Sequence, residues 1–212
     1  MLQAFQRTPQ ENLPIQPLPI LAVADQGSNF DIFETDQIYF YDTEISPNKL
    51  EVMMEWERTI MSASAAYVTQ NGGDILEIGF GMGISAGYIQ SHSIDSHTIY
   101  ENHPDIIPKA LAWAEGKSNV TIVTGSWYDA FHARYKSTNG TNWTNTFGTF
   151  DGLFMDTYGD KSAYKFSGSL KHMMKSDGVA TWWNSITGSN NYYNIPNVTY
   201  DIIDIDPPAN SY

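Results

Sequence analysis

The chain has 212 residues, of which 42% are hydrophobic and 14% aromatic, so it can bury a substantial core within one domain. Its 11 basic and 24 acidic side chains give a net charge of −13, which argues against nucleic acid or an anionic membrane surface as a partner. A cationic or neutral small molecule suits this charge better. The absence of cysteine excludes disulfides and thiolate metal sites, and the five histidines show no ligand spacing, so we expect no metal.

The ends of the chain carry no pattern typical of export or membrane insertion. The N-terminus lacks a basic segment followed by an apolar run, and no apolar stretch approaches ~20 residues. We therefore expect a cytoplasmic monomer or homodimer. Residues 1–45, with prolines at positions 9, 14, 17 and 19, are expected to form an N-terminal arm and a possible lid, and residues 46–212 a single domain.

A long helix is predicted from Ser46 to about Val68, because Ser46 can cap it and Asn71-Gly72-Gly73 can stop it. At ~100° per residue, one face of this helix is an apolar stripe. The stripe comprises Leu50, Met53, Met54, Ile60, Met61 and Val68. Glu57 falls in the middle of it, where a carboxylate either pairs with a cation, extends to the surface or serves a ligand.

After this helix, short apolar runs alternate with helical stretches. Strands are predicted at 74–80, 97–101, 120–124, 150–156, 178–184 and 197–206, and helices at 83–90, 104–115, 127–135 and 161–175. This alternation predicts an α/β fold, in which a mostly parallel sheet of six to seven strands has helices on both faces.

The first of these strands ends in "LEIGFGMGISAG", which places Gly79, Gly81 and Gly83 at a strand-to-helix turn. Two cofactors fit such a turn. From Gly81 the sequence satisfies G-x-G-x-x-A and Glu101 could bind a ribose, so a dinucleotide is possible. Glu77 instead favours S-adenosylmethionine, because a carboxylate there can face an ammonium group and would repel a pyrophosphate.

Six segments in order carry a family resemblance, which runs from about Val52 to Tyr158 and ends in a C-terminal motif. They are "VMMEWERTIM", "LEIGFGMGI", "IYENHPD", "GSWYDAF", "FDGLFMDTY" and "DPPANSY". Together they resemble guanidinoacetate N-methyltransferase and the related fungal-type arginine N-methyltransferases. The resemblance implies a Rossmann-like class I methyltransferase fold, the cofactor S-adenosyl-L-methionine, and N-methylation of a small-molecule guanidino substrate.

The resemblance also implies roles for individual residues. Glu57 and Asp156 would be catalytic and hold the substrate guanidinium, with Tyr158 beside them. The residues implied at the cofactor are Met53, Met61, Glu77, Gly79, Phe80, Gly81, Met82, Gly83, Ile84, Glu101, Asn102, His103, Ser126, Trp127 and Asp156. Paired carboxylates suit a guanidinium, since each can accept two N–H groups from its planar fork and so orient the nitrogen that attacks.

Other interpretations of the same residues stay open. Asp156 could merely cap the segment after its strand, and Trp127 could be a core aromatic. The chain departs from the family after its fifth strand, where family residues are missing, and Gly159 stands where the family has proline. A protein that binds S-adenosylmethionine without methylating a guanidine, and a nicotinamide-dependent oxidoreductase, are the alternative functions.

Overall fold

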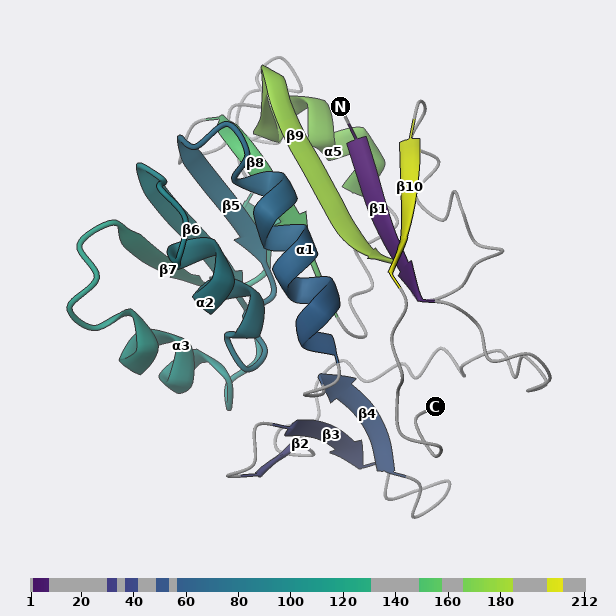
Figure 1. Cartoon of the computed structure of the whole chain (residues 1–212). Coiled ribbons are helices and arrows are strands. Elements are labelled where there is room, and N and C mark those ends of the chain that lie inside the picture. Colours follow the sequence, from purple (N-terminus) through teal and green to yellow (C-terminus); the bar gives the residue numbers. More distant parts are fainter. Residues whose placement is uncertain are drawn as a thin grey trace, which may run out of the picture.

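The computed structural model is dominated by one large parallel sheet (Figure 1). The structure describes residues 2–7, 30–33, 37–41, 49–53, 57–130, 149–157, 166–184 and 198–203. The sheet has seven strands in the order β10-β1-β9-β8-β5-β6-β7, and every neighbouring pair is parallel. Because the strands run the same way, their carboxyl ends meet at one edge of the sheet.

The five central strands follow the predicted alternation of strands and helices. They are β5 (Asp74–Ile78), β6 (Ser96–Glu101), β7 (Val120–Thr124), β8 (Phe150–Met155) and β9 (Met174–Asn184). The helices between them are α2 (Ile84–Gln90), α3 (Ile107–Ala114) and α5 (Phe166–Met173). The prediction of a Rossmann-like parallel α/β arrangement is confirmed.

Each face of the central sheet has its own apolar core. One core joins α1 (Arg58–Val68), α2 and α3 to strand residues that include Ile75, Ile99 and Phe154. The other joins Trp127, Phe166 and Leu170 to the alternate strand residues, among them Leu76, Leu153 and Ala180. Burial on both faces explains why the central strands have nearly continuous apolar sequences.

The contact between α1 and β8 is especially close at Gly152. A side chain there would overlap the backbone carbonyl of Val68, the last residue of α1. The helix ends where predicted, and Gly72 and Gly73 follow it with positive φ angles of 64° and 78°. The glycines therefore stop α1 and turn the chain into β5.

Two further strands lie at one edge of the large sheet. β1 (Leu2–Arg7) lies between β9 and β10 (Val198–Ile203), pairing Leu2 with Val198 on one side and with Ala180 on the other. A segment expected to belong to an extended arm thus supplies a strand to this sheet. Its extended backbone agrees with the expectation, whereas its pairing with β9 and β10, which were themselves predicted as strands, was not predicted.

The predicted helix from Ser46 is wrong in its first half. β4 (Lys49–Met53) is a strand that pairs with β3 (Gln37–Tyr41), which in turn pairs with β2 (Phe30–Phe33), and the helix starts only at Arg58. The i, i+3 spacing of Leu50 and Met53 is too short a pattern to distinguish a helix from a strand that finds backbone partners. Figure 1 shows this small antiparallel sheet beyond the carboxyl ends of the large sheet, where α1 begins.

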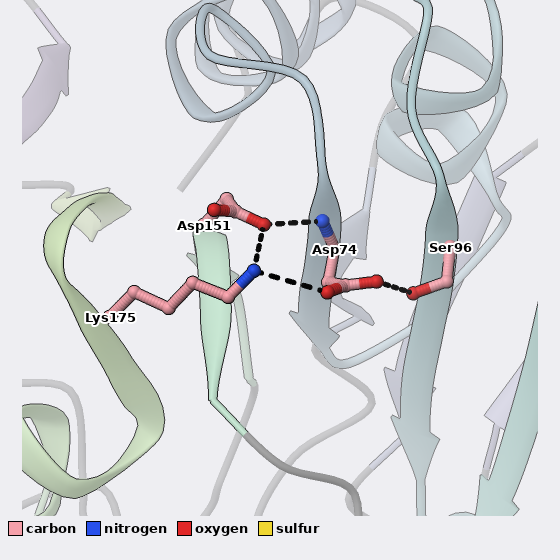
Figure 2. A network of polar contacts seen from close by, with 4 residues as sticks. All are labelled: Asp74, Ser96, Asp151 and Lys175. Carbon is pink, nitrogen blue, oxygen red and sulfur yellow. Dashed lines mark hydrogen bonds and ion pairs between the residues drawn. The ribbon is translucent and has the colours of Figure 1, made fainter.

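A network of polar side chains joins the amino ends of four strands (Figure 2). Lys175 Nζ lies 3.2 Å from Asp74 Oδ2 and 2.7 Å from Asp151 Oδ2. The Asp74 backbone N–H donates to Asp151 at 2.7 Å, and the Ser96 hydroxyl donates to Asp74 at 2.6 Å. We call these four residues the amino-end network. One cation here balances two carboxylates at the edge of the sheet opposite to the glycine turn.

Candidate functional site

The glycine turn lies where predicted, between β5 and α2. Gly79, Gly81 and Gly83 have φ angles of 94°, 54° and 76°, which side chains rarely adopt. A side chain at Gly79 would overlap the backbone carbonyl oxygen of Asp156, and the Asp156 N–H donates to Ile78 O at 2.9 Å. The turn therefore packs directly against the segment after β8, and this contact brings Asp156 beside it.

Glu101, at the end of β6, anchors the same turn through its carboxylate. Its Oε2 accepts the backbone N–H groups of Phe80 at 2.9 Å and Gly81 at 3.4 Å. Its Oε1 accepts those of Asn102 at 2.8 Å and His103 at 2.7 Å. Four backbone donors thus compensate the charge of a side chain that is only 7% exposed. The sequence predicted that Glu101 belongs to the candidate site. It did not predict that the Glu101 carboxylate holds the glycine turn through backbone hydrogen bonds.

Glu77 is completely buried within β5. Its Oε1 accepts a hydrogen bond from the Ser85 hydroxyl on α2, and its Oε2 lies 2.9 Å from His97 Nε2 on β6. Sequence reasoning expected this carboxylate to face a cofactor ammonium and did not single out Ser85 or His97. One feature of the sequence could have identified His97. It lies in a predicted buried strand, two residues before Ile99, so its side chain lies on the same face of the sheet.

Asp156 is the candidate residue with the most perturbed acidity. It directly follows β8 and is partly exposed. Burial of its carboxyl raises its pKa from 3.8 to about 7, and the nearby charge of Glu77 contributes in the same direction. At neutral pH the group therefore lies near the midpoint of its titration, and a bound cation would favour its ionised form.

Glu57 does not lie mid-helix, as predicted, but immediately before α1. It occupies the N-cap position, its side chain makes no capping hydrogen bond, and it is 3% exposed. Met61, one helical turn further, is buried in the core beneath α2. The correction results from the later start of the helix, which leaves Glu57 just before α1, and Figure 1 shows that α1 begins at the end of the sheet toward which β5 runs.

The remaining candidate side chains are mostly packed into the cores. Trp127 meets Phe166 edge to face at 6.3 Å between ring centroids, and Phe80 packs on Trp113 at 5.5 Å. Met82 is half-buried and Ile84 buried on the α2 side. The Ser126 hydroxyl accepts the Asp129 N–H at 3.3 Å. Met53 lies in β4, described by its backbone alone, and Tyr158 falls outside the described residues.

Two absences apply to the part of the chain that the structure describes. No group of three or more histidine or acidic side chains there could hold a metal ion. No helix among those residues is both long and apolar enough to cross a membrane.

The site geometry agrees with a family match over most of the chain. A family model described as guanidinoacetate N-methyltransferase matches residues 36–197. The chain belongs to this family. The predicted resemblance to guanidinoacetate and fungal-type arginine N-methyltransferases is confirmed, and the family's cofactor, S-adenosylmethionine, is the cofactor of this chain.

Curated proteins with similar sequences are named as arginine N-methyltransferases. The chain is 30% identical over 178 residues to "Protein arginine N-methyltransferase 2" of Saccharomyces cerevisiae, covering 76% of this chain and 41% of the relative. It is 34% identical over 141 residues to the protein of that name in Aspergillus fumigatus, covering 64% and 31%. The chain thus spans less than half the length of these relatives.

Solved structures with a similar arrangement are more distant. A spermidine synthase from Thermotoga maritima has a TM-score of 0.48 at 14% identity, covering 75% of this chain and 56% of its own. An SAH-bound methyltransferase from Podospora anserina has a TM-score of 0.39 at 17% identity, covering 60% and 52%.

The residues around the glycine turn have the chemistry that S-adenosylmethionine requires. The glycines expose backbone at the start of α2, and the Glu101 carboxylate lies directly beside them. Its bond to Gly81 is the longest of its four and is the one that a ribose hydroxyl could most readily replace. The acidic side chains Glu77 and Asp156 nearby suit a cationic ligand and oppose an anionic one.

Proposed function

We propose that the chain is an S-adenosylmethionine-dependent N-methyltransferase that acts on a guanidino group, guanidinoacetate-like or arginine-like. The observation that carries this proposal is the position of Asp156, a carboxyl group with a raised pKa that packs beside the glycine turn through Gly79. Glu57, directly before α1, is the second carboxylate of the proposed site. The family to which the chain belongs supplies the choice of acceptor.

In the proposed reaction these two carboxylates bind and orient the acceptor. A free guanidinium has a pKa above ~12, so its nitrogens carry protons and are poor nucleophiles. Glu57 and Asp156 would each accept N–H groups of the planar fork, leaving one nitrogen directed at the reacting methyl. When bound, S-adenosylmethionine would supply that methyl group by cleavage of its S–C bond and would leave as the neutral thioether. As the N–C bond forms, the nitrogen loses a proton.

Asp156 is the candidate acceptor of that proton. Its raised pKa of about 7 makes it a far better base than an ordinary aspartate, although a bound guanidinium would lower this value. Glu57 would then hold the cation. The proton passes from the nitrogen to Asp156 and then to water, so the atoms and charges of the transfer balance.

The proposed cofactor contacts centre on the turn from Gly79 to Gly83 and on Glu101, with Asn102, His103, Ser126 and Trp127 at the rim.

The proposal also includes a sheet of six to seven strands, in which the edge pair β1 and β10 completes the five central ones. Residues 1–45 were expected to close over the site when ligands bind; since β1 is a strand of the large sheet, we propose this closure for the part of the arm that follows β1. The small antiparallel sheet beyond the carboxyl ends of the strands supports this lid (Figure 1).

The experiment that tests the function is methyl transfer to a panel of acceptors. We would incubate the chain with S-adenosylmethionine and guanidinoacetate, free arginine or an arginine-containing peptide, and detect methylated products by mass spectrometry. Methylation of a guanidino nitrogen in any of these supports the proposal, and the preferred acceptor separates a small-molecule enzyme from a protein-modifying one. The matched control is Glu57→Gln, which removes one substrate carboxylate and leaves the glycine turn unchanged.

A second candidate function is kept because the glycine turn and Glu101 support cofactor binding independently of the two proposed substrate carboxylates. It is a protein that binds S-adenosylmethionine without methylating a guanidine. Calorimetric titration distinguishes the two functions: tight binding of S-adenosylmethionine with no methylated product on the whole panel would overturn the proposed enzyme in favour of a binding protein.

A further inference from the structure

Phe80 lies in the glycine turn, between Gly79 and Gly81, yet its side chain is buried within the protein. Only 2% of the residue is exposed. Its backbone N–H donates to Glu101 Oε2 at 2.9 Å, and its carbonyl oxygen accepts the Gly83 N–H at 2.8 Å. A residue in the middle of the turn is therefore held by both of its backbone polar groups.

The Phe80 ring also contacts the start of α2. A Cβ atom at Gly83 would lie 2.7 Å from Phe80 Cζ and 3.0 Å from Cε2, so the edge of the ring lies against the backbone of this glycine. Gly83 is the N-cap residue of α2 and has a φ angle of 76°. The position of the ring and the conformation of the turn therefore depend on each other, because the ring fills the space that a side chain at Gly83 would occupy.

Trp113, on α3, packs against the Phe80 ring. The two ring centroids are 5.5 Å apart and the rings are tilted by 59°, an arrangement in which aromatic rings attract each other. Other contacts hold the indole itself: Lys117 Nζ lies 4.3 Å from its centroid, and the His97 ring meets it edge to face at 6.4 Å. Trp113 thus links α3 to the glycine turn.

The freedom of this turn matters for binding. Its three glycines by themselves allow many backbone conformations, and a ligand that binds only one of them must restrict the others. A loop that is held in its binding conformation beforehand loses less conformational entropy when the ligand arrives. The contact of Trp113 with Phe80 supplies such a restraint from inside the protein.

We propose that Trp113 is a positioning residue of the cofactor site: through the Phe80 ring it keeps the glycine turn in the conformation that binds S-adenosylmethionine. The inference rests on the proposed function only in placing the cofactor at this turn. Trp113 acts through Phe80 and makes no contact of its own with the cofactor. A residue that only filled the core would affect stability and leave the cofactor affinity unchanged.

The test measures the Kd of S-adenosylmethionine by calorimetry, together with the melting temperature, in the full chain. Trp113→Leu removes the indole and leaves the sequence of the turn intact, and its affinity should fall about tenfold. Phe80→Leu should weaken binding similarly. The double variant should bind no more weakly than Phe80→Leu alone, because Trp113 acts through that ring.

The matched control is Phe150→Leu, the same substitution in the core on the other face of the sheet, at the start of β8. Phe150 is 2% exposed, like Phe80, so the two variants should lose comparable stability. Phe150→Leu should keep the wild-type affinity for S-adenosylmethionine.

A second readout needs no ligand. Hydrogen exchange of the Phe80 and Gly83 amides should be faster in Trp113→Leu than in Phe150→Leu, because only the first substitution loosens the turn. Should Trp113→Leu fail to fold, Trp113→Phe replaces it in the same set of variants, and its smaller ring should weaken binding about threefold. Three results would overturn the inference: a wild-type affinity in the folded Trp113 variant, a loss that adds to that of Phe80→Leu, or an equal loss in Phe150→Leu.

These readouts require no methyl transfer, so the two proposals fail separately. A chain that methylates no guanidine but shows the expected pattern of affinities refutes the proposed function and retains the role of Trp113. A chain that methylates a guanidine, with a cofactor affinity indifferent to Trp113, retains the function and refutes that role.

Discussion

The amino-end network and the carboxyl groups near the glycine turn differ in how their charges are balanced. In the amino-end network, Lys175 bridges Asp74 and Asp151, so each carboxylate has a cation within 3.2 Å. Near the glycine turn, burial and the charge of Glu77 raise the pKa of Asp156, and Glu77 itself has only His97 Nε2 within 2.9 Å. One end is balanced by the protein itself, whereas the other has negative charge that a cationic ligand would balance. The sheet thus combines a charge-balanced amino end with the end that we propose to bind ligands.

The largest expected effect is on turnover at the ligand-binding end. Glu57→Gln keeps the volume of the side chain and removes its charge, so methyl transfer should fall by two or more orders of magnitude, about 3 kcal/mol. The melting temperature and the affinity for S-adenosylmethionine should change little. Turnover and melting would be measured on one preparation of the variant. Normal turnover in a destabilised variant would identify Glu57 as a structural residue instead.

Cofactor binding should show the next largest effect, at Glu101. Glu101→Gln keeps the size of the side chain but replaces one acceptor oxygen by a donor, so two backbone N–H groups lose a partner. We expect a loss of about 2 to 3 kcal/mol in S-adenosylmethionine binding, roughly a hundredfold in Kd by calorimetry. The melting temperature should fall too, because this carboxylate also holds the glycine turn. Binding within threefold of wild type would refute the assignment.

A smaller effect, in stability, concerns Asp156. Its folded pKa of about 7 lies above the ordinary value of 3.8, so the folded state loses stability as the pH rises from about 4 to 7. Asp156→Asn should therefore be more stable than wild type at pH 8, by about 1 to 2 kcal/mol, and equal to it near pH 3.5. Urea denaturation at both pH values measures this. Equal stability of the two proteins at pH 8 would contradict the raised pKa.

The smallest effect, with the opposite dependence on pH, is expected at the amino-end network. Burial alone would raise the pKa of Asp151, but hydrogen bonds from Lys175 and the Asp74 backbone, together with the charge of Lys175, lower it below 3.8. Its contribution is therefore present above pH 4 and is lost as the pH falls through the lowered value. Asp151→Asn should destabilise by less than about 1 kcal/mol at pH 7 and by nothing at pH 2, without affecting cofactor affinity. A change in affinity would remove the contrast between the two ends.

Much of the central fold could be predicted because its signals are local. The strand ending at Ile78, the glycines after it and the helix from Ile84 are all encoded within one short segment. Its position at a strand end likewise indicated Glu101 as a ligand of a ribose, whereas the site role of Asp156 came from the family resemblance. The strand and helix predictions needed only the alternation of the two and the common direction of parallel strands.

The contacts that could not be predicted depend on segments far apart in the chain. β4 was predicted as the start of a helix because its partner β3 was not visible in the local pattern. The contact of His97 with Glu77 depends on the register between β5 and β6, in which Glu77 lies opposite Ile99. Charge compensation was equally hidden: no local pattern shows that Glu101 is held by the backbone of Phe80, or that Lys175 lies beside Asp74.

The position of β1 has a consequence for the order of folding. Residues 2–7 pair with residues 198–203, so these two strands can meet only after almost the whole intervening chain has been brought back on itself. Closing such a long loop costs more conformational entropy than joining β5 to β6, whose strands are separated by one short helix. The central strands should therefore assemble first, with this edge added late. In hydrogen exchange, the amides of β1 and β10 should accordingly open at a lower free energy than those of β5.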